Sequence, residues 1–173
     1  MNEPKTMQGK GVTLNVRSLN GSIKRRSTFR WLHNQNAHFY FLQETYSDEK
    51  SKAIWEAEWG GKIFCSHGTK HSKGVMILFN PKYDIEVERF EKDNCGRLVI
   101  LDTKINGSNL ILVNVYAPNE IAQQVQFFEK INNKLLSYAD ENILIGGDFN
   151  CPLTAFDKIG SRPVENKIKK NSH

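Results

Sequence analysis

The chain has 173 residues, of which 39% are hydrophobic and 25% charged, a composition typical of one soluble globular domain. Its 24 Lys and Arg against 19 Asp and Glu give a formal charge of +5, which is compatible with a polyanionic partner without establishing one. No apolar run approaches the ~20 residues of a membrane span, and residues 1–11 lack the apolar core of a signal peptide. We therefore expect a single domain over residues 1–173 in the cytoplasm or nucleus, with no membrane association.

Three cysteines, Cys65, Cys95 and Cys151, are spread along the chain. No CxxC pair or Cys/His group has the spacing of zinc ligands, and an odd number of scattered cysteines is not a disulfide framework. We expect reduced thiols in an intracellular protein.

The first half of the chain alternates apolar strands with helices. Residues 12–16 (VTLNV) alternate apolar and polar side chains, and residues 39–45 (FYFLQET) form a nearly continuous apolar run, so both are predicted strands. A helix is expected between them, over about residues 22–35, and a second helix through Trp55 to Trp59.

The faces and caps of these two helices can also be predicted. Phe29 and Leu32 should face the core, whereas the basic run of residues 24–26 should lie on the solvated face. Ser47 is the expected N-cap of the second helix, and the acidic residues 48 and 49 suit its positively polarised first turn.

Several strands without intervening helices follow, with the sequences KIFC, VMILF, IEVERF and RLVILDTKI. The last of these turns at Asn106-Gly107 into NLILVNVYA, which predicts a β-hairpin. A helix to about Tyr138 is then predicted by apolar residues at helical spacing. These residues are Ile121, Val125, Phe128, Ile131 and Leu135.

A last buried strand, residues 143–146, is expected to be broken by Gly146-Gly147. Hairpins combined with helical crossovers favour a four-layered α/β sandwich, in which two mixed β-sheets pack face to face and helices flank them on the outside.

Polar side chains stand at or just past the ends of the predicted strands, where sites of layered α/β folds tend to lie. The six residues are Asn15, Glu44, Tyr116, Asn119, Asp148 and Asn150. If the strands share a core, these residues converge at one rim. Asp148 offers a general base or metal ligand, and Asn150 offers an amide that orients water or phosphate. Taken singly, each residue has another explanation. Asp148 with Asn150, and likewise Asn15 and Asn119, could belong to ordinary turns; Glu44 could be a charged residue ending a strand, and Tyr116 a packed aromatic.

Four segments occur in the order and rough spacing of the endonuclease/exonuclease/phosphatase superfamily, and the chain resembles that superfamily through them. They are NVRSLNG (15–21), FLQETY (41–46), NVYAPN (114–119) and GGDFN (146–150). The connecting segments KRRSTFRWL, SKGVMILFN and GRLVIL are similar to the apurinic-endonuclease-like domain of non-LTR (LINE-type) retrotransposons. The resemblance covers residues 12–162, and residues 163–173 form a polar, basic tail.

The resemblance implies a deoxyribonuclease-I-like sandwich that lacks its C-terminal strands. The family's domain continues well past GDFN to a Ser-Asp-His strand, whereas 23 residues follow Asn150 here. Ser172-His173 lacks the intervening aspartate and follows GDFN too closely, so we interpret it as unrelated to that motif.

The resemblance also implies catalytic roles. Glu44, with Asn15, would hold Mg²⁺ or Mn²⁺, because carboxylate and amide oxygens suit such hard cations. Asp148 would activate the attacking water, which Asn150 would help to position. Tyr116 would donate a hydrogen bond to the phosphate.

DNA would be the substrate, bound partly by Asn119 on the phosphate and partly by a basic loop carrying Lys70, His71 and Lys73. The expected reaction is hydrolysis of a phosphodiester that nicks DNA and leaves a 3′-hydroxyl for target-primed reverse transcription. The resemblance also implies a monomer, and a reverse transcriptase in a full-length element, which this sequence does not contain. Two alternatives stay open: an inactive retroelement remnant without the Ser-Asp-His motif, and a phosphodiesterase of the same fold that acts on a non-DNA phosphoester.

Overall fold

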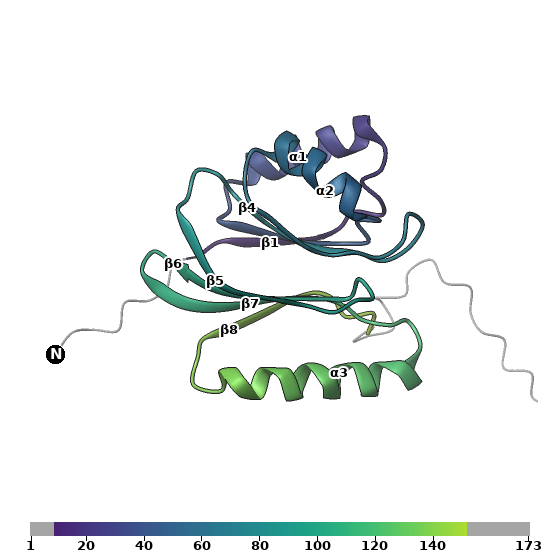
Figure 1. The fold of residues 1–173 in the computed structure, drawn as a ribbon, viewed down its shortest axis with the longest axis vertical. Helices are drawn as coiled ribbons and strands as arrows, with labels where there is room; N and C mark the ends of the chain where they lie inside the picture. Colours follow the sequence, from purple (N-terminus) through teal and green to yellow (C-terminus); the bar gives the residue numbers. More distant parts are fainter. Residues whose placement is uncertain (1–8, 152–173) are drawn as a thin grey trace, which may run out of the picture.

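The computed structural model describes residues 9–151, which form a four-layered α/β sandwich (Figure 1). One sheet has the order β1-β2-β4-β3 and the other β5-β6-β7-β8. The strands of the first sheet are β1 (Gly11–Asn15), β2 (Phe39–Gln43), β3 (Ile63–Ser66) and β4 (Val75–Phe79). Those of the second are β5 (Ile85–Lys92), β6 (Leu98–Ile105), β7 (Ser108–Tyr116) and β8 (Ile143–Asp148).

Helices cover the outer face of each sheet, which confirms the expected fold class (Figure 1). Helices α1 (Ser22–Gln35) and α2 (Glu49–Trp59) lie over the first sheet. Helix α3 (Ile121–Leu135), extended by the 3-10 turn η1 (Leu136–Tyr138), lies over the second. The tail of residues 163–173, with Ser172-His173, lies outside the described residues. No helix among residues 9–151 is long and apolar enough to cross a membrane.

Two parallel strand pairs bring four carboxyl ends to one rim of the sandwich. Strands β1 and β2 pair in parallel with Asn15 opposite Gln43, and β7 and β8 pair in parallel with Tyr116 opposite Asp148. Strand β8 also packs against β1 and β2 across the sandwich. The ends of all four strands therefore meet where the sequence predicted a site.

The core has three layers, one between each pair of neighbouring sheets or helices. Under α1 and α2, the Trp59 ring stacks on His33 at 4.0 Å, and its indole N–H donates to the Phe79 carbonyl at 2.7 Å. The inward direction predicted for Phe29 and Leu32 is confirmed, because both are buried. Each large apolar side chain buried in this way stabilises the fold by about 1.5–3 kcal/mol.

Two details of the first helices differ from the sequence prediction. Arg25 is buried, not solvated: its guanidinium pairs with Glu58 at 2.6 Å and donates to the Leu19 carbonyl at 2.9 Å. The N-cap of α2 is Asp48, whose carboxylate accepts from the Ser51 N–H in a capping box. Ser47 is not the cap because its hydroxyl is bonded to other side chains, described below.

The predicted buried face of α3 is wrong at its N-terminal end. Ile121 and Val125 are exposed, and Gln124 is buried in their place. The Gln124 amide donates to the carbonyls of Pro118 and Asn150, so hydrogen bonding to the neighbouring loops sets the face of the first turns. From Phe127 onward the apolar residues face the sheet as expected.

The glycines of β8 do not break the strand, which continues to Asp148. A Cβ at Gly146 would come within 2.7 Å of the Phe41 ring, and Gly147 has φ +136 beside the Val115 backbone. The two glycines therefore allow β8 to approach both its neighbour β7 and the opposite sheet closely. This close approach places Asp148 beside residues of the first sheet.

Candidate active site

Four of the predicted residues form one hydrogen-bonded cluster at the rim. The Asn15 amide Nδ2 donates to Glu44 Oε1 at 2.8 Å and to Asp148 Oδ2 at 2.9 Å. The Tyr116 hydroxyl donates to the same Glu44 oxygen at 3.1 Å. The cluster thus joins the ends of β1, β7 and β8 with the residue that follows β2.

Within the described part of the chain, the two carboxylates of the cluster lack a basic partner. Among residues 9–151, neither Glu44 nor Asp148 forms an ion pair with Lys, Arg or His. Both are half-buried, and the Asn15 amide that bridges them is neutral. Two neighbouring carboxylates bridged in this way favour a bound cation, since like charges held close together repel each other.

The donor chemistry of the cluster suits Mg²⁺ or Mn²⁺. Within the described residues no group of three His, Cys, Asp or Glu side chains converges, so a complete protein cage for a metal is not present there. Mg²⁺ needs no such cage: it commonly uses one or two carboxylates, keeps several waters and takes further oxygens from phosphate. Glu44 and Asp148 supply carboxylate oxygens of this kind. The Asn15 amide oxygen accepts from the Arg17 N–H at 3.2 Å.

Glu44 is held in a backbone conformation that ordinary residues avoid. Its φ is +54, and that of Tyr46 is +56. Neighbouring loops fix this segment through backbone hydrogen bonds, from the Ser18 N–H to the Glu44 carbonyl at 2.7 Å and from the Thr45 N–H to the Gly74 carbonyl at 3.0 Å. Left-handed conformations of this type cost about 1–3 kcal/mol each and persist where the surroundings over-determine them.

Asp148 and Asn150 are oriented by their own turn. The Asn150 N–H donates to Asp148 Oδ1 at 3.1 Å, and the Asn150 amide donates to the Ala117 carbonyl at 2.7 Å. Asn150 has φ +49, which asparagine tolerates better than most residues. This turn leaves Asp148 Oδ2 directed at Asn15 and fixes the start of the next segment against the end of β7.

Tyr116 is a proton donor at neutral pH. Burial and the adjacent Glu44 carboxylate raise the pKa of its phenol to about 12. The Arg97 guanidinium lies over the Tyr116 ring at 5.1 Å and donates to the Tyr116 carbonyl at 2.9 Å. Arg97 therefore places a cation beside Tyr116, and it was not predicted as a site residue.

The basic loop predicted to contact DNA borders the cluster through Tyr46. The Tyr46 N–H donates to the Lys73 carbonyl at 2.9 Å, and the Asn20 amide donates to the Lys70 carbonyl at 3.0 Å. The side chains of Lys70 and His71 are exposed, and that of Lys73 is half-exposed. The loop that carries Lys70, His71 and Lys73 therefore lies beside the cluster, at the same rim of the sandwich.

Asn119 is the predicted site residue that the cluster does not include. It is exposed in the loop between β7 and α3, beyond Tyr116 and the buried Pro118. None of the described hydrogen bonds joins its side chain to Glu44, Asn15 or Asp148.

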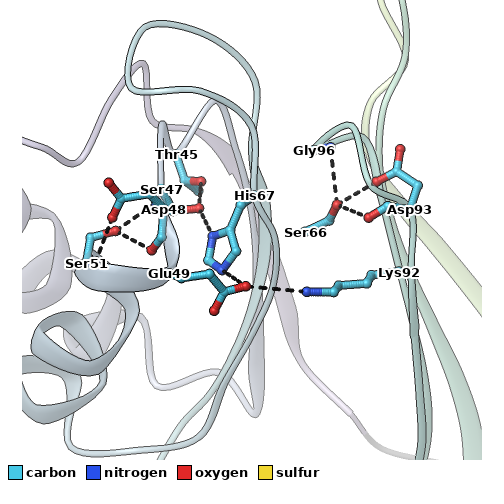
Figure 2. A network of polar contacts seen from close by, with 10 residues as sticks. All are labelled: Thr45, Ser47, Asp48, Glu49, Ser51, Ser66, His67, Lys92, Asp93 and Gly96. Atoms are coloured by element: carbon cyan, nitrogen blue, oxygen red, sulfur yellow. Dashed lines mark hydrogen bonds and ion pairs between the residues drawn. The ribbon is translucent and has the colours of Figure 1, made fainter.

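A polar network anchors the basic loop beside the segment that carries Glu44 (Figure 2). His67 Nδ1 lies 2.9 Å from the Ser47 hydroxyl, which accepts from Thr45 at 3.1 Å. On its other side, His67 Nε2 lies 3.2 Å from Glu49, which also faces Lys92 at 3.7 Å. Burial, with a smaller contribution from Lys92, lowers the pKa of His67 below its usual value.

A second part of the network joins the two sheets, between Ser66 at the end of β3 and Asp93 just after β5. Figure 2 shows Ser66 donating to Asp93, while the Gly96 N–H donates to the Ser66 hydroxyl at 3.2 Å. Gly96 in turn accepts from the Gly74 N–H at 3.0 Å, next to the segment that carries Glu44. The loops around the cluster therefore support one another.

Comparison with known proteins agrees with the fold and the motifs. Residues 12–163 match the Endonuclease/Exonuclease/phosphatase family. The chain is 33% identical over 147 residues to the Transposon TX1 uncharacterized 149 kDa protein of Xenopus laevis, in a match that covers 84% of this chain and 11% of that protein.

Solved structures share the fold at lower identity. An AP endonuclease from Archaeoglobus fulgidus has a TM-score of 0.64 and 21% identity, over 87% of this chain and 61% of that one. The 3′ phosphatase NExo from Neisseria, bound to a product DNA hairpin, has a TM-score of 0.66 and 18% identity, over 87% of this chain and 61% of that one. The chain thus spans about three fifths of these structures and about a tenth of the transposon protein. With its four ordered motifs and its sandwich of two mixed sheets, the chain belongs to the Endonuclease/Exonuclease/phosphatase family.

Proposed function

We propose that this chain is part of a metal-dependent DNA endonuclease domain of a LINE-type retrotransposon. It would hydrolyse one phosphodiester, nick the DNA and leave a 3′-hydroxyl that primes reverse transcription. The observation that carries the proposal is the cluster in which Asn15 bridges Glu44 and Asp148 while Tyr116 donates to Glu44.

Each residue of the cluster has a role that follows from its contacts. Asp148, fixed by the Asn150 N–H, orients the attacking water and accepts its proton. Tyr116 stays protonated because its pKa is raised to about 12, so it donates to the charge that develops on the phosphate. The Asn15 amide holds the Glu44 and Asp148 carboxylates next to each other. The Asn150 amide fixes the turn on which Asp148 lies.

Glu44, with Asn15, would hold Mg²⁺ or Mn²⁺. When bound, such an ion neutralises a non-bridging phosphate oxygen and polarises the phosphorus. Glu44 is suited to this role because it has no basic partner among the described residues and its position is fixed by the loops on either side.

DNA is favoured as the substrate by the basic side chains at the same rim. Lys70, His71 and Lys73 lie on the loop that borders Tyr46, and Arg97 lies over Tyr116. Basic side chains along a groove or rim bind the phosphate backbone and position it without reading sequence. Asn119, exposed next to Tyr116, would hydrogen-bond a flanking phosphate.

The test is nicking of supercoiled plasmid by the whole 173-residue chain with Mg²⁺, compared with Glu44→Ala and Asp148→Ala. Loss of a group that contacts developing charge reduces a rate by about 10²–10³, so both variants should nick at that reduced rate or not at all. Chelation with EDTA should abolish nicking by the unmodified chain.

Asp102→Ala is the matched control. Asp102 is also a half-buried carboxylate, but it lies in the middle of β6, opposite Ile111 and away from the rim. Nicking that survives Glu44→Ala and Asp148→Ala would refute the proposal. Cleavage of a soluble phosphodiester without cleavage of plasmid would show that the substrate is not DNA.

A further inference from the structure

A buried layer of amide side chains lies directly beneath the cluster. Asn114 and Gln43 are 0% and 1% exposed, and the Gln43 amide Nε2 donates to Asn114 Oδ1 at 2.8 Å. Gln43 comes from the first sheet and Asn114 from the second. This hydrogen bond therefore crosses the space between the two sheets.

Both amides occupy positions where the strand pattern calls for apolar residues. On β2, Phe39 and Phe41 fill the inter-sheet core, and Gln43 follows on the same face two residues later. On β7, Leu110 and Leu112 fill the same core and Asn114 is the next residue on that face. A buried amide costs free energy unless its hydrogen bonds are made, so its presence here needs a reason.

Both amide protons of Asn114 and its amide oxygen are hydrogen-bonded. Its amide Nδ2 donates to the Leu42 carbonyl at 3.1 Å and to the Met76 carbonyl at 2.8 Å. Leu42 and Met76 are register partners on β2 and β4, so one side chain from the second sheet is bonded to two strands of the first. Gln43 is further held by the Thr13 hydroxyl at 3.1 Å.

Three of the four cluster residues follow the two amides and their partner Thr13 along β1, β2 and β7. Thr13 precedes Asn15 by two residues on β1, Gln43 directly precedes Glu44, and Asn114 precedes Tyr116 by two residues on β7. Asn15, Glu44 and Tyr116 are therefore each the next residue, or the next residue on the same face, after one of these three hydrogen-bonded residues, whereas Asp148 follows Gly146 on β8. A shift of the sheets at this level moves Glu44 relative to Tyr116.

We propose that Gln43 and Asn114 are positioning residues for the active site, and that their hydrogen bond fixes the separation of the two sheets that carry Glu44 and Tyr116. The role rests on the proposed function, because it concerns the geometry of the same cluster. Neither amide reaches the substrate side of the cluster: they act through the backbone that ends in Glu44 and Tyr116.

Nuclear magnetic resonance of the side-chain amide of Asn15 tests the proposal without requiring activity. Its two protons donate to Glu44 and Asp148, so their chemical shifts report the geometry of the cluster in the absence of divalent cations. The resonances are identified by their loss in Asn15→Asp. We expect Asn114→Ala and Gln43→Ala to move them, and the double variant to move them no further than the larger single change.

Asn80→Ala separates positioning from general loss of stability. Asn80 is also 0% exposed, and its amide donates to the Ala37 carbonyl at 2.8 Å, but it follows the opposite end of β4. It should lower the melting temperature about as much as Asn114→Ala and leave the Asn15 resonances in place. If Asn114→Ala does not fold, Asn114→Ser, which keeps a hydroxyl at the position, replaces it. Asn15 resonances that stay in place in the Asn114 variant, or that move equally in Asn80→Ala, would overturn the proposal.

Kinetics give a second readout. A displacement of about 1 Å in a reacting group can cost about 10²-fold, so kcat for nicking should fall at least about tenfold in Asn114→Ala while KM for DNA changes less than about twofold. An equal rise in KM with unchanged kcat would contradict a positioning role. If the unmodified chain does not nick DNA, the proposed function fails, whereas the resonances of Asn15 still decide the role of the amide layer.

Discussion

Left-handed backbone conformations occur in two regions of this molecule, and the residues that adopt them differ in kind. Away from the rim they belong to asparagine and glycine: Asn36 and Gly60 end α1 and α2, and Asn106-Gly107 form the hairpin turn between β6 and β7. These residue types adopt positive φ at little cost. At these turns, the left-handed conformation is adopted by residue types for which it costs little free energy.

At the rim the same conformation is adopted by residues that do not favour it, among them Arg17, Ser18, Glu44, Tyr46 and Lys73. All lie on the three loops that surround the cluster, and those loops are joined by backbone hydrogen bonds. At the rim, side chains that are needed at fixed positions therefore occupy backbone conformations that cost local free energy. Two predictions test whether this strain belongs to the site, and a third concerns the loop beside it.

The largest effect is expected at a glycine that borders Glu44. Gly74 has φ +93, and a Cβ there would collide with the Thr45 hydroxyl. Gly74→Ala combines about 1–2 kcal/mol for a left-handed residue with about 1–3 kcal/mol for overpacking, so unfolding by urea should show a loss of about 2–5 kcal/mol. Gly60→Ala, at φ +77 but with open space around the Cβ, should lose only about 1–2 kcal/mol. Equal losses of unfolding free energy in Gly74→Ala and Gly60→Ala would show that the backbone at the rim is no more tightly constrained than at the end of α2.

A smaller effect is expected at Glu44 itself, where a glycine variant should be more stable than an alanine variant. Both Glu44→Gly and Glu44→Ala remove the carboxylate, but only alanine retains the left-handed strain. The glycine variant should be the more stable by about 0.5–1 kcal/mol, the strain of alanine less the chain entropy of glycine. Thermal or urea denaturation measures the difference. At the exposed helical residue Glu129 the order should reverse, with alanine more stable by about 1 kcal/mol. A Glu44→Ala variant more stable than Glu44→Gly would show that Glu44 is not strained.

The smallest effect concerns pH. Burial lowers the pKa of His67, while the nearby Glu49 and Asp48 carboxylates oppose the shift and Lys92 adds to it. Because the unfolded chain binds the proton more readily, stability is fully present above the ordinary imidazole pKa of about 6.5 and falls as pH decreases below it. Urea unfolding at about pH 5.5 and about pH 7.5 should show this fall, on either side of that pKa.

Two variants in the same loop make the comparison. His67→Gln should reduce the pH dependence, whereas His71→Gln should not, because His71 is exposed. The same pH dependence in His67→Gln as in the unmodified chain would contradict a contribution from His67.

The strands and their rim were predictable from the sequence because strand ends are local features. Alternating apolar residues located β1, continuous apolar runs located β2 and β4, and the Asn106-Gly107 turn located the hairpin of β6 and β7; the motifs located Asn15, Glu44, Tyr116 and Asp148. Arg97 could also have been predicted from the sequence. A turn at Asn106-Gly107 places residue 97 opposite residue 116, as the observed pairing of Leu98 with Val115 implies. The hairpin register alone would have added Arg97 to the site.

The remaining features depend on contacts between segments far apart in the chain. Arg25 looks solvated in a basic run, and only the position of Glu58 on α2 explains its burial. Gln124 replaces the expected apolar face of α3 because of carbonyls in two other loops. Polar residues buried through long-range partners give no periodic pattern, which is why Gln43 and Asn114 were also missed.

The hydrogen bond from Asn15 to Asp148 joins residues 133 positions apart. During synthesis, the amide leaves the ribosome long before the second carboxylate exists, and the intervening strands and helices must form before the two can meet. Contacts of such long sequence separation form late, because they require closure of the largest loops. The cluster therefore forms only when folding is nearly complete: while the chain is only partly folded, the Glu44 and Asp148 carboxylates are not yet held together.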